Sequence, residues 1–383
     1  MIRRLIRLAV LLAAVALPAL AGLWPVLANE DVIEESGLVP VKIGGETVRL
    51  EMLVVRSRSA GTARLPVVLI SHGKPASRAD MAAVHATNYR SIAQDFARRG
   101  WLAVAVVRRG YGLSEGAFPS AGTCRTGFDL LRQFHAEAED LAGALAVIAA
   151  RKEADATRVL ALGASNGAMA SLALAADQPR AVRAVVNISG GLRNKECPFE
   201  DQLVAAFRDL GAKVSAPSLW LYAENDSYFP PAVVSRLKGA YAEGRAPVSF
   251  VMLPPVSDDG HRLFSNIEGR LRWWPEVDRF LRTLGLPTWP EGLVDEIMKS
   301  QQIDPRHRPS VERYVSAPGE KALVKAANGA AVYWWAGAET EDEAARRALS
   351  SCVDKKAQPC QLVLSNQATV GAGATAGNPA AKR

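Results

Sequence analysis

The feature that most constrains this 383-residue chain is a serine flanked by two glycines, where an apolar strand gives way to a small-residue helix. Residues 159–167 read Val-Leu-Ala-Leu-Gly-Ala-Ser-Asn-Gly, so Gly163 and Gly167 lie two positions before and after Ser165. A sharp strand-to-helix turn strains the serine backbone and leaves no room for side chains at those two positions. The pattern is typical of a nucleophile elbow, which exposes the serine hydroxyl. The alternative is a tight turn around a buried serine.

Apolar runs alternate with helical repeats through the first three quarters of the chain, which predicts an α/β fold. We expect a mostly parallel sheet with helices on both faces, and reacting groups beyond the carboxyl ends of its strands. The predicted strands are 47–56, 66–70, 101–107, 158–162, 182–188, 218–222 and 248–253, and the predicted helices are 87–99, 134–151, 231–243 and 266–284.

The first 28 residues have the composition of an export signal. Three arginines precede an apolar run from Leu8 to Leu23, and Val26–Ala28 offers small residues for cleavage. The segment from Leu8 to Ala28 is just long enough to cross a bilayer, so an uncleaved membrane anchor is the alternative. We predict a periplasmic or secreted protein.

The rest of the chain divides by composition. We predict an α/β domain over 29–285, a Pro-rich irregular linker with one short helix over 286–318, a small α+β module over 319–368 and a disordered tail over 369–383. In the module, two predicted strands flank a helix that begins with a capping-box signature at residues 340–343. The module is similar to small disulfide-bearing domains of exported bacterial proteins. It is expected to contact the cell envelope or to serve only as a stabilising appendage.

The four cysteines suggest two disulfides, because an even count in an exported chain is typical of a disulfide framework. Three connectivities are open, and proximity in sequence favours Cys352–Cys360 together with Cys124–Cys197. No group of cysteines and histidines has metal-ligand spacing, so neither a metal nor a cofactor is expected. The formal net charge of +7 is scattered, without a basic run, which argues against a nucleic-acid partner.

Two insertions follow strands on either side of the serine turn. Residues 112–133 contain Cys124 and residues 190–214 contain Cys197, so a bridge between them would tie both loops over the site. Aromatic residues of these loops and of the next one are expected to line an apolar pocket: Phe118, Phe128, Phe199, Tyr228 and Phe229.

A serine nucleophile needs a base, and the base needs an orienting acid. In α/β sheets of this kind the chain order is serine, acid, histidine. Three of the five histidines precede Ser165 and another lies in the predicted linker, which leaves His261. For the acid we prefer Asp226, at the end of the 218–222 strand. The alternatives are Glu224, Asp258 and Asp259.

Attack on an acyl carbon also needs hydrogen-bond donors for the developing oxyanion. The turn itself supplies the backbone N–H of Asn166. The second donor is expected from the loop after the 66–70 strand, at the backbone of Gly73 and Lys74, with His72 bracing that loop.

Together these segments resemble the α/β-hydrolase superfamily over residues 40–285. The matching motifs, in order, are His72-Gly73, Arg109–Gly116, Gly163–Gly167, Asn225-Asp226 and Gly260-His261. The Arg109–Gly116 segment is similar to that of dienelactone-hydrolase-like and X-prolyl-peptidase-like members. Those members often carry Asp two residues before the Arg-Gly pair, where this chain has Val107.

The resemblance implies a serine hydrolase, and we expect it to cleave a carboxylic ester through an acyl-enzyme. The substrate is expected to be a small-molecule ester or a short peptide-like molecule. One alternative is a peptidase or amidase with the same three residues. The other is an inactive hydrolase domain that binds the cell envelope. The oligomeric state is left open.

Overall fold

The computed structural model describes residues 26–28, 31–125, 127–194, 197–244, 246–326, 331–354 and 359–369. Most of the predicted export signal and all but the first residue of the predicted tail lie outside these ranges. Val26–Ala28 forms strand β1, so cleavage after Ala28 would remove that strand from the mature protein. No helix among the described residues has the length and apolar character needed to cross a membrane.

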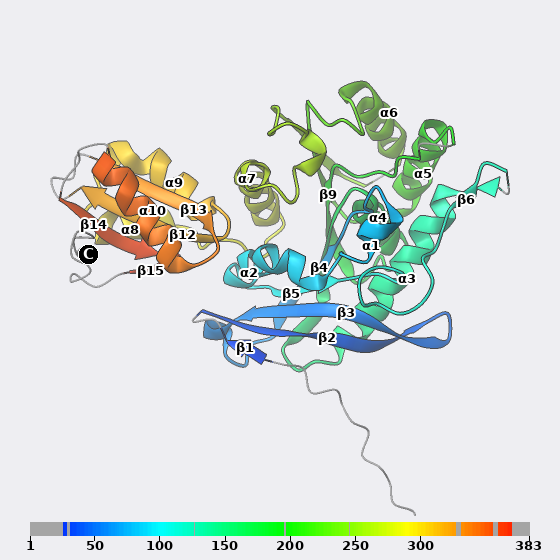
Figure 1. The fold of residues 1–383 in the computed structure, drawn as a ribbon, viewed down its shortest axis with the longest axis horizontal. Coiled ribbons are helices and arrows are strands. Elements are labelled where there is room, and N and C mark those ends of the chain that lie inside the picture. The colour runs from blue at the N-terminus through cyan, green and yellow to red at the C-terminus, as the bar shows by residue number, and fades with distance from the viewer. Residues whose placement is uncertain are drawn as a thin grey trace, which may run out of the picture.

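The main sheet contains nine of the described strands in the order β1-β2-β3-β5-β4-β8-β9-β10-β11 (Figure 1). β1, β2 and β3 are antiparallel to their neighbours, and every adjacent pair from β5 to β11 is parallel. Besides β1, the strands are β2 (Val32–Ile43), β3 (Glu46–Ser57), β4 (Leu65–Ser71), β5 (Leu102–Val106), β8 (Ala154–Ala164), β9 (Val182–Ile188), β10 (Ser218–Ala223) and β11 (Val248–Leu253). A short hairpin of β6 (Gly122–Thr123) and β7 (Gly127–Phe128) projects beside it.

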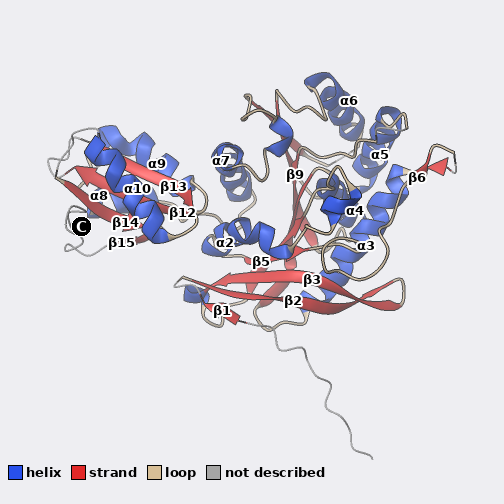
Figure 2. Ribbon diagram, in the orientation of Figure 1, coloured by secondary structure: helices blue, strands red, loops and turns tan. Residues whose placement is uncertain are grey.

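Helices cover both faces of this sheet (Figure 2). One face packs against α3 (Leu130–Ala149), α4 (Asn166–Asp177), α5 (Glu200–Lys213) and α6 (Pro231–Ala242), and the other against α2 (Arg90–Arg98) and α7 (Ile267–Thr283). Because both faces are buried, the central strands are continuous apolar runs rather than alternating ones. The predicted α/β-hydrolase fold is confirmed.

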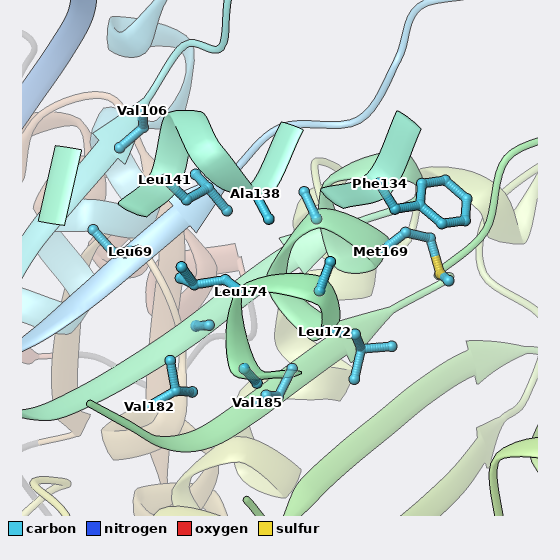
Figure 3. Close-up of a cluster of buried hydrophobic side chains, with 14 of the residues drawn as sticks. Leu69, Val106, Phe134, Ala138, Leu141, Met169, Leu172, Leu174, Val182 and Val185 are labelled. Atoms are coloured by element: carbon cyan, nitrogen blue, oxygen red, sulfur yellow. The ribbon is translucent and has the colours of Figure 1, made fainter. Parts of the chain in front are cut away.

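The core beneath the serine turn is densely apolar (Figure 3). Leu69 and Val185 of the sheet pack with Leu141 of α3 and Leu174 of α4 in one buried cluster. The first ten residues of α4 are all buried, and most of them are small. Small side chains let this helix approach the sheet closely, so its amino end is held rigidly against the strand that carries Ser165.

The two longest elements of this domain that were not predicted are β2 and α5. β2 carries the adjacent charges Glu34 and Glu35, which mask its strand pattern; Glu34 is buried and accepts hydrogen bonds from Arg90 and Gln94. α5 lies within the 190–214 insertion and buries only one stripe of side chains, Leu203 and Phe207 among them. In both cases tertiary partners stabilise a segment whose local composition is polar.

A second, four-stranded antiparallel sheet forms the C-terminal module, in the order β13-β12-β14-β15. Its strands are β12 (Glu320–Ala326), β13 (Val332–Ala338), β14 (Cys360–Ser365) and β15 (Ala368–Thr369). Helix α10 (Glu341–Asp354) packs on one face of this sheet, and α8 (Leu293–Ser300) and α9 (Arg308–Ser316) pack on the other.

The segment 286–318, expected as an irregular linker with one short helix, contains both α8 and α9. Trp289, Met298 and Tyr314 from this segment share a buried cluster with Leu323 of β12. Pro309 suggested a linker but occupies the first turn of α9, where proline is compatible with a helix because the first turn has no intrahelical N–H to lose. The segment is therefore part of the module's core.

A buried ion pair, Arg98 with Glu320, and hydrogen bonds join the module to the main domain. Arg98, in the last turn of α2, contacts Asp31 and Glu320, and Arg99 pairs with Asp278 of α7. The Arg99 guanidinium also donates to the Ser316 carbonyl. The end of α2 leads into the amino end of β5, so this junction lies toward the sheet edge opposite Ser165.

Candidate active site

Ser165 is the single residue between β8 and α4, and its backbone is strained. Its φ of 52° and ψ of −124° lie in a region that L-residues rarely adopt. The neighbouring strand holds this conformation, because the Ser165 N–H donates to the Ile188 carbonyl at 2.9 Å. The side chain is thereby directed away from the core at the carboxyl end of β8.

The two flanking glycines are required by close backbone approaches. A Cβ at Gly163 would lie 2.2 Å from the Gly167 carbonyl oxygen. A Cβ at Gly167 would lie 2.3 Å from the His72 carbonyl and 2.4 Å from the Ser71 carbonyl. Cβ atoms in proteins essentially never come so near to other atoms. The clashing atoms here are backbone atoms, which cannot move aside as the end of a flexible side chain could.

We expect Gly167→Ala to lower the free energy of unfolding by about 3 kcal/mol and to abolish most activity, because the new methyl group pushes α4 away from β4. Denaturant unfolding monitored by circular dichroism measures the change. Gly239→Ala in α6 is the matched control, since no atom lies within 4 Å of its added Cβ and alanine favours the helix. Equal stability of the two variants would contradict the expected strain.

His261 lies between Ser165 and Asp226. Its Nε2 is 3.1 Å from the Ser165 hydroxyl, and its Nδ1 is 3.0 and 3.2 Å from the two Asp226 carboxylate oxygens. Nδ1 therefore donates to the carboxylate, which leaves the Nε2 lone pair facing the hydroxyl. The structure thus brings together three residues from three separate loops in the order expected of a base-activated serine.

The Asp226 carboxylate is fully buried and held by the backbone. Its Oδ1 accepts the amide N–H groups of Tyr228 and Phe229 at 2.9 and 3.0 Å. Of the alternatives, Asp259 instead accepts from Ser227 and from the His261 backbone, and Asp258 lies near Arg262 at the surface. Glu224 is exposed. Of the four carboxylates considered, only Asp226 has its side chain hydrogen-bonded to the imidazole.

The loop carrying His261 is fastened by Asn225, whose role beside Asp226 was not predicted. The Asn225 amide donates to the Val256 and Ser257 carbonyls and accepts the Val256 N–H. A Cβ at Gly260 would lie 2.6 Å from the Asn225 side chain, so glycine permits this approach. The sequence feature that indicates this role is the adjacent pair Asn225-Asp226.

Aromatic rings orient the imidazole. Tyr228 stacks on His261 with ring centroids 4.1 Å apart and an interplanar angle of 11°, and Phe229 meets the same ring edge-on at 5.5 Å. The imidazole side chain retains 15% exposure. Packing on two sides restricts its rotation, so the hydrogen bond to Asp226 need not do so alone.

The predicted oxyanion donors lie beside the serine. Asn166 occupies the first position of α4, where a backbone N–H has no partner within the helix. Lys74 lines the same cavity as Ser165, and the Cβ position of Gly73 is 3.4 Å from that of Ser165. Among the described residues, neither the Asn166 nor the Lys74 amide has a hydrogen-bond acceptor.

His72 braces this loop through a defined tautomer. Its Nε2 accepts the Arg108 N–H at 3.0 Å, so its protonated Nδ1 donates to the Gly73 carbonyl at 2.8 Å. Burial, and then the neighbouring Arg108 charge, hold the pKa of His72 well below the usual histidine range, so the ring is neutral. The N–H of Lys74 and the carbonyl of Gly73 belong to the same trans peptide, so they point in opposite directions. Because the Gly73 carbonyl faces His72, the Lys74 N–H points away from His72.

A buried ion pair ties both oxyanion segments together, and sequence reasoning missed it. The Asn166 side chain donates to both carboxylate oxygens of Glu137, which lies 3.1 Å from the Arg108 guanidinium. Arg108 in turn donates to the Ser71 hydroxyl and the His72 carbonyl. Arg108 and Glu137 are 0% exposed, and neither sits in a recognisable motif, so only the tertiary structure shows the pair.

Ser165 opens into a cavity of about 310 Å³ whose lining is more polar than expected. An apolar pocket lined by five aromatic residues was predicted, but of these five only Tyr228 lines the cavity. Phe118 packs against Tyr111, and the remaining three belong to the buried core or pack against it. The cavity is lined by Lys74, Pro75, Ala76, Ser165, Leu192, Arg193, Asn194 and Tyr228.

Both disulfides are present, Cys124 with Cys197 and Cys352 with Cys360. The first joins the two insertions beside the site, and residues 192–194 of the second insertion line the cavity. No group of three or more His, Cys, Asp or Glu side chains in the described ranges is arranged to hold a metal ion. His85 and His135 lie elsewhere, each beside a carboxylate.

Residues 44–217, somewhat less than half of the chain, match the family model of the X-Pro dipeptidyl-peptidases (S15 family). No curated protein matches the sequence significantly.

Solved structures match this chain at low sequence identity and with TM-scores below 0.5. A protein assigned as a dienelactone hydrolase from Klebsiella pneumoniae is 20% identical, with a TM-score of 0.47 over 66% of this chain and 98% of that one. An acetyl xylan esterase from Paenibacillus sp. R4 is 14% identical, with a TM-score of 0.48 over 68% and 88% of the two chains. An esterase from Pyrococcus furiosus is 15% identical, with a TM-score of 0.45 over 65% and 90%.

The strand order, the serine turn between β8 and α4 and the family match place the chain in the α/β-hydrolase superfamily. Within that superfamily it is a hydrolase of the esterase or peptidase type.

Proposed function

We propose that the chain is an exported serine hydrolase that cleaves a carboxylic ester with Ser165, His261 and Asp226. The observation that carries the proposal is the line of hydrogen bonds from the Ser165 hydroxyl through both His261 nitrogens to the buried Asp226 carboxylate, at the edge of an open cavity. A buried carboxylate on Nδ1 stabilises the imidazolium that forms when Nε2 takes the serine proton.

In the proposed reaction the Ser165 oxygen attacks the ester carbonyl as its proton passes to His261. The oxyanion is held by the Asn166 and Lys74 amides, and the C–O bond to the alcohol breaks as His261 returns the proton to that oxygen. Water, deprotonated by His261, then attacks the acyl-enzyme. The products are the carboxylic acid and Ser165 with its proton restored.

The family match favours a second candidate, a peptidase that releases dipeptides. Its substrates would present a free amino terminus, which is an ammonium group at neutral pH. Among the residues that the structure describes, the charged side chains that line the cavity, Lys74 and Arg193, are both positive, and no acidic residue lines it. Such a lining repels an ammonium group, so we favour the ester.

Export is supported by the two disulfides, which form and persist in oxidising compartments such as the periplasm. For the C-terminal module we favour a stabilising role. It is docked through the buried Arg98–Glu320 ion pair and the hydrogen bond from Arg99 to the Ser316 carbonyl, and none of its described residues lines the cavity at Ser165. We retain the catalytic domain over 29–285 and extend the module to include α8 and α9.

We expect a fluorophosphonate probe to label the purified protein on the peptide containing Ser165. We also expect kcat/KM for p-nitrophenyl acetate to exceed that for alanyl-proline p-nitroanilide by at least about 100-fold, given the electrostatic penalty on the ammonium and the poorer leaving group. Faster release of the anilide would identify a peptidase. Absence of labelling together with absence of hydrolysis would favour a binding protein with an inactive hydrolase domain.

A further inference from the structure

The cavity beside Ser165 has a one-sided charge. Within the described part of the chain, its only charged lining residues are Lys74 and Arg193, and neither forms an ion pair with an acidic side chain there. The Lys74 ammonium lies 5.9 Å from the Phe118 ring centroid. The open face of the site therefore presents uncompensated positive charge to whatever enters.

Two acidic groups on the His261 side of the site, Asp226 and Asp259, are already engaged. Asp226 is fully buried behind His261, and its Oδ1 is used by two backbone amides and the imidazole. Asp259 accepts from the Ser227 backbone and hydroxyl and from the His261 backbone. Neither carboxylate lines the cavity, so neither neutralises Lys74 or Arg193 there.

Arg193 contacts the same aromatic ring that stacks on the proposed base, His261. Its guanidinium carbon lies 5.5 Å from the Tyr228 ring centroid, and Tyr228 stacks on His261. One Nη1 proton is directed to the Ser227 carbonyl at 3.4 Å. A guanidinium has five N–H donors, so others stay available for a planar anion.

The loop that carries Arg193 is also fastened. The Cys197 N–H donates to the Asn194 side chain at 3.0 Å, and Cys197 is bonded to Cys124 in the other insertion. The contact of the Arg193 guanidinium with the Tyr228 ring and the disulfide of its loop both reduce the freedom that the arginine loses on binding, which favours recognition by this side chain.

We infer that the substrate is an ester that carries an ionised carboxylate, and that Arg193 binds this group while Lys74 adds to the attraction. The inference rests on the proposed function. The carboxylate takes no part in bond making or breaking. It orients the ester so that its carbonyl meets Ser165.

The test compares two p-nitrophenyl esters of similar length, the hemisuccinate and the pentanoate. We expect kcat/KM for the anionic ester to exceed that for the neutral one by about tenfold, the size of one partly exposed charge-assisted contact. Arg193→Gln is expected to bring this ratio close to one, and 0.5 M NaCl to lower it. A second pair, 4-carboxyphenyl acetate and phenyl acetate, asks whether the recognised charge lies on the alcohol side.

Arg183→Gln is the matched control. Arg183 is an exposed arginine at the amino end of β9, at the opposite edge of the sheet, so its loss changes the net charge equally and should preserve the ratio. If Ser165-dependent hydrolysis of neutral esters is found but neither pair shows a preference that Arg193→Gln removes, the carboxylate subsite is wrong and the proposed function stands. If no ester is hydrolysed and Ser165 is not labelled, both are wrong.

Discussion

Ser165→Ala is expected to lower kcat for the best ester by about 10⁵- to 10⁶-fold while leaving the free energy of unfolding nearly unchanged. The variant is expected to keep the strained turn, because alanine and serine both carry a Cβ and differ only in the hydroxyl group. Alanine has no oxygen to attack the carbonyl. What remains is the contribution of binding and of the oxyanion donors. Initial rates, corrected for spontaneous hydrolysis, measure the loss.

Ser189→Ala is the matched control for this substitution. Ser189 directly follows the neighbouring strand β9, is buried, and also has a positive φ, 46°. Its hydroxyl has no hydrogen-bond partner among the described residues, whereas that of Ser165 faces His261 at 3.1 Å. We expect its activity to stay within about threefold of wild type. A similar loss in both variants would attribute the effect to packing, and an unaffected Ser165→Ala would refute the mechanism.

Asp226→Asn is expected to lower kcat by about 10⁴-fold with little change in fold. The Tyr228 and Phe229 amides both donate to Oδ1, so the asparagine carbonyl must take that position and its NH₂ group the other. The NH₂ group then donates to His261 Nδ1, which places the imidazole proton on Nε2. An Nε2–H cannot accept the serine proton, so the base is present in the wrong tautomer.

Asp259→Asn tests whether any carboxylate near His261 supports catalysis as Asp226 does. Asp259 lies two residues before His261 and accepts its backbone N–H at 2.9 Å, but it does not bond the ring. We expect a loss of at most about tenfold, from a loosened loop. Equal effects of the two substitutions on kcat would argue against a specific role for Asp226. Steady-state kinetics at neutral pH and thermal unfolding of each variant separate the catalytic from the structural effect.

Local patterns were informative where the chain itself imposes the geometry. Gly163 and Gly167 indicated a tight turn from the sequence because Gly163 packs against Gly167 within the turn itself, although Gly167 also lies against the distant Ser71 and His72 carbonyls. Continuous apolar runs indicated the central parallel strands because both of their faces are buried. β2, α5, α9 and β12 escaped prediction because their polar or proline-containing segments are stabilised by distant partners, such as Arg90 for Glu34.

The sequence by itself determined the serine turn, the parallel α/β sheet and a short set of candidate partners, since these follow from periodicity, glycine placement and chain order. Only the tertiary structure decided which carboxylate reaches His261, that Arg108 and Glu137 join the two oxyanion segments, and that the cavity is positively charged rather than apolar. The physical reason is that hydrogen bonds and ion pairs depend on distances of about 3 Å. Such distances arise between loops far apart in the sequence only when the sheet brings their ends together.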